Sequence, residues 1–387
     1  MIPESFQLDV RTMPLTRLAA RHPLPASGER EQPWHAYCLK SPAGTAPAES
    51  VRRSGCQSLE VQDMDGSKLL RATALGLLIA TWSYPGAASA AEKASVRLNW
   101  IPGAEHGFFF FAKQKGWYSE AGIDLEIIAG QGSTLVVKTV GNGDNEFGMA
   151  DGASIARGWE AGVPLVSTAV LLTESPASIY SPKSAGIATI KDICGKRIGV
   201  NIKSTTYAQY QAMVRLAELK DCKYDEVPTA AGGIKEVLAH AVDGAVTYAY
   251  EDPLMLEVQG IPVNQILAKD FFKLYSIALV TNQTLASTKQ DLIARFTAVT
   301  LKALKHTVAH PDDAVDAFLK VSPSANLAYE KVKLAYFNRL LAGDDPTGAK
   351  IGQQTASGWD ASLETLIKIG IVSKKMDSAG KFLPLSE

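Results

Sequence analysis

The stretch VRLNWIPGAEHGFFFFAKQKGWYSEAGIDLEIIAG, residues 96–130, decides the fold. Its short apolar runs flank a helical pattern, which predicts a strand at 96–100, a helix at 107–115 and a second strand at 124–128. The same alternation continues, with further strands expected at 146–150, 164–170, 197–201, 244–248 and 277–281 and helices at 133–140, 154–161, 207–220, 233–241, 253–259, 289–309 and 325–341. Alternating strands and helices indicate parallel sheets. Two rounds of them predict an α/β fold with two lobes, each a doubly wound, mostly parallel sheet flanked by helices.

Composition limits the kinds of partner that this protein can have. The chain has 387 residues, 46% of them hydrophobic, and a formal net charge of −1. It is long enough for two cores, and without a long basic run it lacks the positive field that nucleic acids or anionic membranes require. It contains no P-loop, G-x-S-x-G, H-E-x-x-H or G-x-G-x-x-G motif. We therefore expect a small-molecule partner, no catalytic residue, no metal and no cofactor.

The N-terminal part differs from the rest of the chain. Residues 1–63 show no periodic pattern, which predicts a disordered leader or a wrongly assigned start. Basic residues, the apolar run 72–82 and the small residues Ala88 and Ala90 then give 64–90 the pattern of a signal peptide. We expect translation to begin at residue 64, cleavage after Ala90 and a periplasmic protein; a buried helix or an N-terminal anchor is the alternative.

Removal of that leader leaves two of the four cysteines, Cys194 and Cys222. Cys194 precedes an expected strand, and Cys222 ends the helix that follows this strand. Because such a helix runs back antiparallel to its strand, the two thiols can come close enough to form a disulfide in an oxidising compartment. Two buried free thiols are the alternative.

Residues that directly follow the strands are the candidates for a ligand site, because ligands of open α/β sheets bind beyond the carboxyl ends of the strands. Trp100 and His106 could stack on and hydrogen-bond a flat heterocycle, and Glu174 lies among apolar residues where a carboxylate needs a partner. The candidates are Trp100, His106, Gln131, Ser133, Asp151, Glu174, Asn201, Ser204, Thr205, Thr206, Tyr207, Tyr248 and Glu251.

Several of these candidates also have a purely structural interpretation. Ser133 and the run 204–206 stand where helix N-caps are expected. Glu251 precedes a helix that begins around Pro253, where an acidic residue favours the helix terminus. Both interpretations stay open at the level of the sequence.

Five segments together resemble the solute-binding proteins of ABC importers for nitrate, sulfonate and thiamine-pyrimidine compounds. They are Leu98–Pro102 with His106, Phe111–Tyr118, Ala121–Leu125, Gly148–Ala150 and Cys194–Val200. The resemblance runs from about residue 95 to at least residue 319. It implies a type II periplasmic-binding-protein fold that closes on a small molecule and delivers it to a membrane permease with its ATPase, and a protein that acts as a monomer.

Within that group the chain is most similar to the branch that binds aminopyrimidine precursors of thiamine. An enzymatic relative, the fungal thiamine-pyrimidine synthase, has a lysine and a histidine that fall at Ala150 and Ser154 here, and its cysteine-rich iron patch falls at 274–277, which contains no cysteine. Without those groups, Schiff-base and iron chemistry have no residues to carry them. We expect a binding protein, with a thiamine-pyrimidine biosynthetic enzyme as the alternative.

For a protein of this kind we further expect a division into lobes and hypothesise roles for some of the site residues. The first lobe is expected at 94–184 with 277–387 and the second at 185–276, with hinges at 182–186 and 272–276. Trp100 would stack on the ligand, Glu174 and Glu251 would accept its N–H groups, and residues 204–206 would hold its polar tail. An alkanesulfonate, nitrate or an aromatic carboxylate is the second ligand class, for which Lys203 and Arg157 are the candidate cations.

Overall fold

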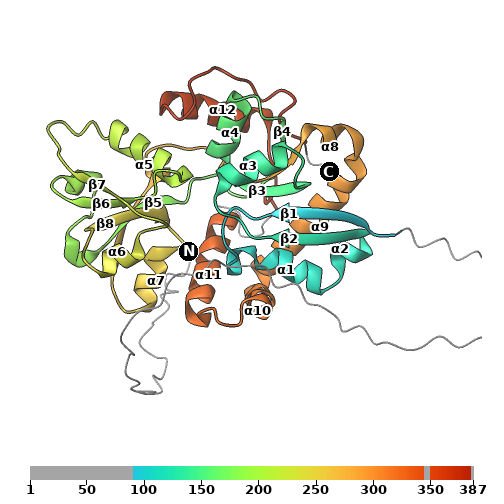
Figure 1. Cartoon of the computed structure of the whole chain (residues 1–387), viewed down its shortest axis with the longest axis horizontal. Coiled ribbons are helices and arrows are strands. Elements are labelled where there is room, and N and C mark those ends of the chain that lie inside the picture. The colour runs from blue at the N-terminus through green and yellow to red at the C-terminus, as the bar shows by residue number, and fades with distance from the viewer. Residues whose placement is uncertain (1–89, 344–348, 385–387) are drawn as a thin grey trace, which may run out of the picture. The chain divides into compact units, whose positions relative to one another are not determined.

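The computed structural model describes residues 90–343 and 349–384, and this part of the chain forms two five-stranded sheets (Figure 1). The leader predicted at 1–63, and the signal peptide predicted at 64–90 except for its last residue, lie outside the described residues. In the described part, no helix is both long and apolar enough to cross a membrane.

The first sheet has the strand order β2-β1-β3-β10-β4. Its strands are β1 (Glu92–Arg97), β2 (Ile123–Ile128), β3 (Phe147–Asp151), β4 (Leu165–Val170) and β10 (Ile277–Asn282). β1 pairs in parallel with β2 and β3, whereas β10 runs antiparallel between β3 and β4. The sheet is therefore mixed, because the chain returns from the second sheet as the antiparallel strand β10.

Helices cover both faces of the first sheet, and the sheet with these helices is called the first lobe below. The helices are α1 (Gly107–Gln114), α2 (Trp117–Glu120), α3 (Ser133–Gly141), α4 (Gly152–Glu160), α8 (Gln283–Thr288), α9 (Gln290–Ala309), α10 (Pro311–Val321), α11 (Leu327–Ala342) and α12 (Ala356–Lys368), with the 3₁₀ turn η2 (Ala104–His106). Ile277 and Leu279 of β10 join the core under α1 and α9, whereas Ala278 and Val280 join the core under α3, α4 and α12. This alternation places one strand between two helical layers.

The second sheet has the order β7-β6-β8-β5-β9 and, with its helices, forms the second lobe. Its elements are β5 (Ala177–Pro182), η3 (Lys183–Ala185), η4 (Ile190–Ile193), β6 (Arg197–Val200), α5 (Thr205–Leu216), β7 (Asp225–Pro228), α6 (Ile234–Leu238), β8 (Gly244–Tyr248), α7 (Asp252–Val258), β9 (Val263–Leu267) and η5 (Ala268–Asp270). β6 pairs in parallel with β7 and β8, and β5 runs antiparallel between β8 and β9.

The chain crosses from the first sheet to the second earlier in the sequence than expected, because β5 belongs to the second sheet. Residues 177–182 were expected in the first lobe, but β5 forms its ladder with β8 and β9, so the chain crosses between β4 and β5, at 171–176. The hinge expected at 182–186 therefore lies inside the second lobe. The return crossing between β9 and β10 spans 268–276 and contains the other expected hinge segment, 272–276.

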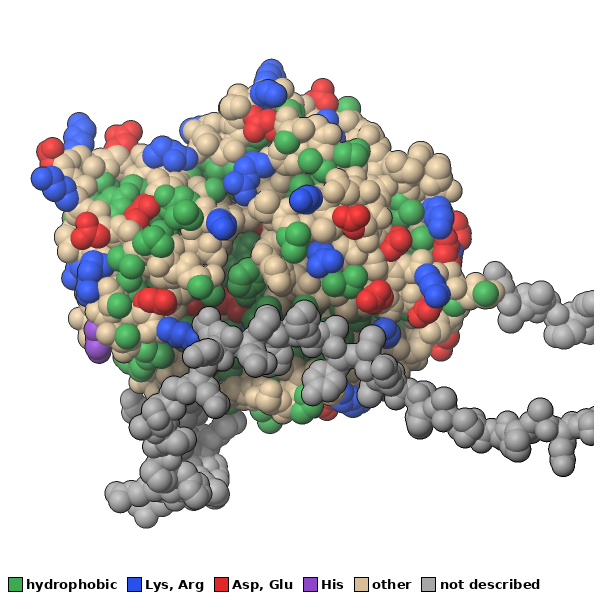
Figure 2. Space-filling view, viewed as in Figure 1, with side chains coloured by type: hydrophobic (Ala, Val, Ile, Leu, Met, Phe, Trp, Pro, Cys, Tyr) green, Lys and Arg blue, Asp and Glu red, His purple; other side chains and the backbone are tan. Residues whose placement is uncertain are grey.

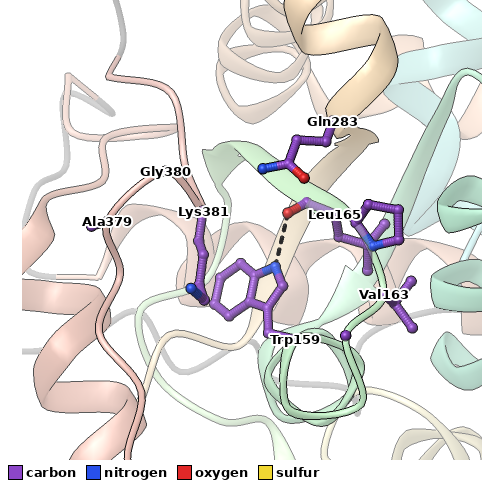
Figure 3. A pocket seen from close by; sticks show the side chains of 9 residues that line it. Trp159, Val163, Leu165, Gln283, Ala379, Gly380 and Lys381 are labelled. Carbon is purple, nitrogen blue, oxygen red and sulfur yellow. Dashed lines mark hydrogen bonds between the residues drawn. The ribbon is translucent and has the colours of Figure 1, made fainter.

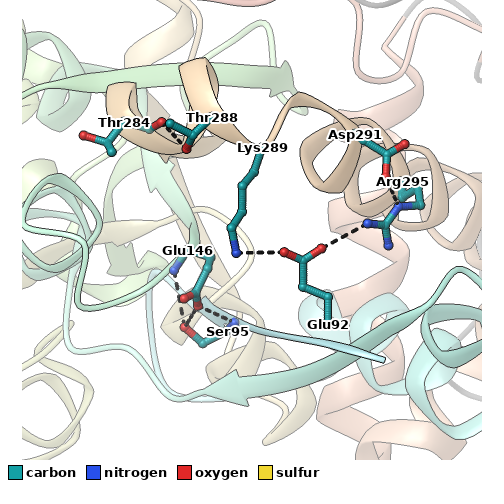
Figure 4. Close-up of polar contacts among 8 residues, drawn as sticks. All are labelled: Glu92, Ser95, Glu146, Thr284, Thr288, Lys289, Asp291 and Arg295. Carbon is teal, nitrogen blue, oxygen red and sulfur yellow. Dashed lines mark hydrogen bonds and ion pairs between the residues drawn. The ribbon is translucent and has the colours of Figure 1, made fainter. Parts of the chain in front are cut away.

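A polar cluster joins the start of the first sheet to the C-terminal helices (Figure 4). The carboxylate of Glu92 in β1 accepts hydrogen bonds from Lys289 at 2.8 Å and from Arg295 of α9 at 3.1 Å. Arg295 also donates to Asp291 at 2.7 Å, one helical turn away. These contacts hold α9 against the N-terminal end of β1.

A disulfide joins Cys194 and Cys222, with 5.1 Å between their Cα atoms. Cys194 lies just before β6, and Cys222 lies beyond the end of α5. This is the strand and helix arrangement that made the pairing possible, and of the two alternatives that the sequence left open the structure has the disulfide.

Candidate functional site

Most of the predicted site residues lie where a strand of one of the two sheets ends. Trp100 follows β1, Ser133 opens α3 after β2, Asp151 ends β3, Asn201 follows β6, Ser204 caps α5 and Tyr248 ends β8. Three strands belong to the first lobe and two to the second, and a hydrogen bond from Tyr248 to Asp151 shows that the strand ends of the two lobes meet.

Asp151 is the centre of these contacts and is fully buried. Its carboxylate accepts hydrogen bonds from the backbone N–H of Ala153 at 2.8 Å and from the hydroxyls of Tyr248 and Ser276, each at 3.0 Å. The amide of Gln209 in α5 lies 3.3 Å from the same carboxylate. Burial raises the pKa of Asp151, and the four donors oppose that shift. Asp151 thus connects β3 with β8, with α5 and with the return crossing.

Two further contacts extend this cluster across the lobes. The hydroxyls of Ser154 in α4 and Thr205 in α5 lie 2.6 Å apart. Ser175, in the first crossing, donates to the side-chain oxygen of Gln209. Ser133 accepts the backbone N–H of Asp151 at 3.0 Å, which ties the start of α3 to the end of β3. The structure thus brings four predicted residues, Ser133, Asp151, Thr205 and Tyr248, into one polar cluster.

The N-terminus of α5 has the structural role that the sequence left open. Ser204 accepts the backbone N–H of Tyr207 at 3.1 Å and donates to the carbonyl of Asn201 at 2.7 Å, so it is the N-cap of the helix. Its hydroxyl also lies 2.8 Å from that of Thr206. Asn201 remains half-buried in the loop after β6.

Trp100 is partly exposed beside the loop that follows β2. Its carbonyl accepts the N–H of Gly130 at 2.9 Å. A Cβ at Gly130 would lie 1.9 Å from the carbonyl oxygen of Leu98, so only glycine permits this approach of the two loops. Gln131 next to it is exposed. The indole thus stands at the end of β1 with part of its surface free.

Each lobe has an exposed isoleucine shortly after the end of one of its strands. Ile101 follows the end of β1 and Ile202 follows the end of β6, and their side chains are 60% and 59% exposed, the highest fractions among the large hydrophobic residues described. Figure 2 shows a hollow between the lobes on the face that it draws, with hydrophobic side chains inside it. Apolar side chains at strand ends suit a ligand with an apolar face.

Glu174 and Tyr207 make their polar contacts outside the Asp151 cluster. Glu174 lies in the first crossing, pairs with Lys269 at 3.4 Å and has a side chain that is 39% exposed. The Tyr207 hydroxyl donates to Glu226 of β7 at 2.9 Å. Glu174 therefore has the partner that was expected for it, but that partner is a lysine of the return crossing.

His106 is completely buried at the end of η2. Its Nε2 lies 2.8 Å from the side-chain oxygen of Asn99, and its Nδ1 accepts the N–H of Gly103 at 3.3 Å. Burial and, secondly, the positive charge of Lys333 lower the pKa of His106 to about 3. The imidazole is therefore neutral at pH 7, with both ring nitrogens engaged by protein atoms.

Glu251, at the N-terminus of α7, faces α11 of the first lobe. Its carboxylate lies 3.1 Å from the ammonium of Lys333 and accepts the Tyr329 hydroxyl at 3.1 Å. Lys333 also pairs with Glu105 of η2 at 2.8 Å. Burial raises the pKa of Glu251, against the attraction of Lys333. The sequence did not single out Lys333 or Tyr329, because nothing in the local pattern of α11 shows that this helix reaches α7.

A cavity of about 160 Å³ lies at the start of β4, between that strand and the C-terminal segment (Figure 3). Trp159 lines it and donates its indole N–H to the carbonyl of Leu165 at 2.9 Å. Lys381 comes from the C-terminal segment on the other side. Across the described ranges 90–343 and 349–384, no group of three or more His, Cys, Asp or Glu side chains is arranged to hold a metal ion.

Comparison with known proteins places this arrangement in a family. The family model described as "NMT1/THI5 like" matches residues 103–314, more than half of the chain. The chain belongs to the NMT1/THI5-like family. The match covers β2 to β10 and includes the Asp151 cluster and Glu251.

Curated proteins similar to this chain carry names of two kinds. The riboflavin-binding protein RibY of Chloroflexus aurantiacus is 24% identical over 251 residues, which cover 63% of this chain and 70% of that protein. The 4-amino-5-hydroxymethyl-2-methylpyrimidine phosphate synthase of Legionella pneumophila is 24% identical over 273 residues, 68% of this chain and 86% of the synthase. The formylaminopyrimidine-binding protein of Halalkalibacterium halodurans is 20% identical over 284 residues, 72% of this chain and 85% of that protein.

Solved structures similar to this chain include periplasmic binding proteins. The aliphatic sulphonate binding protein SsuA from Escherichia coli has a TM-score of 0.59 at 15% identity, covering 76% of this chain and 93% of that chain. The alkanesulfonate-binding protein SsuA from Xanthomonas axonopodis pv. citri, bound to MOPS, has a TM-score of 0.58 at 14% identity, covering 76% and 99%. They confirm the predicted two-lobed periplasmic-binding-protein fold.

Proposed function

We propose that this protein is the substrate-binding component of an ABC import system, which captures a small planar heteroaromatic molecule between its lobes and delivers it to a membrane permease with its ATPase. The observation that carries the proposal is the meeting of polar strand ends from both lobes around Asp151, beside the partly exposed indole of Trp100. Relatives named for riboflavin and formylaminopyrimidine binding support a flat, nitrogen-rich ligand. A thiamine-type aminopyrimidine precursor is the ligand that we favour.

Each chemical feature of such a ligand has a candidate partner. The face of Trp100 stacks on the ring, since aromatic stacking tolerates any flat heterocycle. Glu174 pairs with Lys269 at 3.4 Å but is 39% exposed, so it would exchange this partner for N–H groups of the ligand; a carboxylate in that role rejects ligands without donors. Asn201 and the hydroxyls of 204–206 hold the polar tail at the start of α5. Glu251 is already bound by Lys333 and Tyr329, so in this structure it is not free to accept from a ligand.

The proposal includes export to the periplasm as a monomer. The sequence pattern at 64–90 and the periplasmic binding proteins among the structural neighbours support this location. N-terminal sequencing of the secreted protein is expected to begin near Ala91. Residues from 1–63 at that N-terminus would contradict the assigned start.

Calorimetric titration tests the ligand class and the role of Trp100. Aminopyrimidines, riboflavin, alkanesulfonates, nitrate and aromatic carboxylates are titrated into the protein, its Trp100→Ala variant and, as a matched control, its Trp117→Ala variant, which changes a partly exposed indole on α2. Loss of stacking of about 1–3 kcal/mol raises Kd roughly five- to 150-fold in the first variant only. Binding of sulfonates alone would favour an anion site near Arg157 and Lys203 and would contradict the role of Glu174.

A biosynthetic enzyme is the second candidate, because several relatives are named as pyrimidine phosphate synthases. A Schiff base requires an amine, and Ala150 at the end of β3 offers none, while Ser154 is bonded to Thr205. The purified protein distinguishes the two candidates: an absorbance band of a bound aldimine would establish the enzyme, and a colourless protein that binds and releases an intact ligand would support the carrier.

A further inference from the structure

The buried charge cluster around Lys333 joins the two lobes at a place that the proposed ligand site does not include. Lys333 lies in α11, which packs on α10 and η2, and α10 packs on α1 and η2 of the first lobe. Its ammonium is held between Glu105 of the first lobe, at 2.8 Å, and Glu251 of the second lobe, at 3.1 Å. A single cation is thus shared between one carboxylate from each lobe.

A second polar contact and a ring contact accompany this shared cation. Tyr329, one turn before Lys333 in α11, donates its hydroxyl to Glu251 at 3.1 Å. The rings of Tyr250 and Phe337 meet edge to face, with centroids 5.4 Å apart. Both contacts lie between α11 and the residues that lead into α7, so they belong to the same interface.

We propose that Glu251, Lys333 and Tyr329 form a latch that holds the two lobes closed, with Lys333 as a hub that keeps its first-lobe partner Glu105 when the lobes open. Opening exposes Glu251 to water, where a carboxylate is well solvated, and leaves Lys333 paired with Glu105. In neither state is a buried charge left without a partner or water. A buried ion pair can therefore break and re-form reversibly here. The latch sets the ratio of closed to open molecules. Its effect on ligand capture, but not the latch itself, rests on the proposed function.

The latch gives Glu251 a positioning role in place of the direct ligand contact that its post-strand position suggested. A positioning residue changes the balance between two conformations even when no ligand is present, whereas a ligand contact does not. The decisive measurement is therefore made on the unliganded protein.

The test measures the distance between the lobes by pulsed EPR. Spin-labelled unnatural amino acids replace the exposed residues Lys138 of α3 and Ala239, just after α6, so that the native cysteines stay untouched. The unlatched variants are Glu251→Ala and Tyr329→Phe. The control, Asp243→Asn, breaks the 3.0 Å ion pair of Arg197 with Asp243, which lies wholly within the second lobe.

The unliganded protein and the control are expected to show one short distance, and Glu251→Ala is expected to lower the ratio of closed to open molecules at least tenfold. Tyr329→Phe, which removes only a hydroxyl, is expected to give a smaller shift in the same direction. Combining Glu251→Ala with Lys333→Met is expected to leave the ratio of closed to open molecules as in Glu251→Ala alone, because Lys333 favours closure only through Glu251, whereas its pair with Glu105 is the same in both forms.

Three results would overturn the latch: an unchanged distance in Glu251→Ala, an equal shift in Asp243→Asn, or an open wild-type protein. The ligand assay is independent of these results. If no titrated compound binds but the distances shift as expected, the latch stands and the proposed function fails. If ligands bind and Trp100→Ala weakens them while the distances never change, the function stands and the latch fails.

Discussion

Acidification is expected to destabilise the first lobe through His106. The imidazole is completely buried; its Nε2 contacts Asn99, its Nδ1 accepts the N–H of Gly103, and a carboxylate oxygen of Glu105 lies 3.2 Å from the same Nδ1. Burial lowers its pKa to about 3, and the nearby charge of Lys333 acts in the same direction. In the unfolded chain the pKa of histidine returns to about 6.5.

The sign and size of the effect follow from these two pKa values. Between pH 6.5 and pH 3 the unfolded chain binds a proton that the folded protein does not, so the stability that neutral His106 contributes is present above pH 6.5 and is lost as the pH falls towards 3. Proton linkage gives a loss of about 2 kcal/mol between pH 7 and pH 5. Asp252, whose pKa burial raises to about 6, changes stability in the opposite direction over part of this range.

Urea unfolding of the wild-type protein and of a His106→Gln variant, at pH 7, 6 and 5, separates these contributions. The variant is expected to be less stable at pH 7, because it loses the bonds to Asn99 and Gly103. The difference between the two proteins is expected to shrink by about 2 kcal/mol at pH 5, since only the wild-type protein carries the imidazole, while Asp252 is common to both. A difference that stays the same from pH 7 to pH 5 would refute a buried neutral His106.

Three further changes are expected to lower stability, each measured by urea unfolding. Replacing both Cys194 and Cys222 by alanine opens a cross-link between residues 28 apart, which costs about 3–4 kcal/mol in the chain-entropy description; an unchanged midpoint in the variant would contradict this. Phe296→Ala removes a fully buried ring from the first-lobe core and is expected to cost about 3–5 kcal/mol, whereas a loss below about 1 kcal/mol would mean that the core refills. Gly152→Ala puts a Cβ 2.1 Å from the carbonyl oxygen of Tyr275 and is expected to cost about 1–3 kcal/mol, with wild-type stability as the contrary result.

Part of the order of elements could be predicted, because hydrophobic periodicity indicates which face of an element is buried, but β5, β7 and β9 were not among the expected strands. The long helix expected at 289–309 is α9, Gln290–Ala309, and the one expected at 325–341 is α11, Leu327–Ala342. The lobe to which β5 belongs could not be predicted, because a buried antiparallel strand has the same apolar pattern whichever sheet accepts it. Its partners β8 and β9 are far along the chain, so only the ladder decides its sheet.

The candidate site was predictable in its position but not in its connections. Placement after strands pointed to Asp151 and Tyr248, which the structure joins at 3.0 Å. Gln209 and Ser276 complete that cluster, yet neither follows a strand of the expected list; Gln209 lies one helical turn after Thr205, a spacing that puts both on one face of α5. Lys333 was missed because its partners lie on η2 and α7, and a lysine within an amphipathic helix is ordinarily solvated.

The contacts of Glu251 and the contact between Ser154 and Thr205 both join the lobes, but they have opposite consequences for ligand affinity. Those of Glu251 lie outside the proposed site, so they persist when a ligand binds and reduce the free energy that the ligand must supply for closure. The bond between Ser154 and Thr205 involves a residue that the ligand would use, so it competes with the ligand. A ligand can close the lobes only by the difference between its affinities for the closed and open forms. Selectivity should therefore depend on the groups around Asp151, whereas Lys333 should change the affinity for every ligand by the same factor.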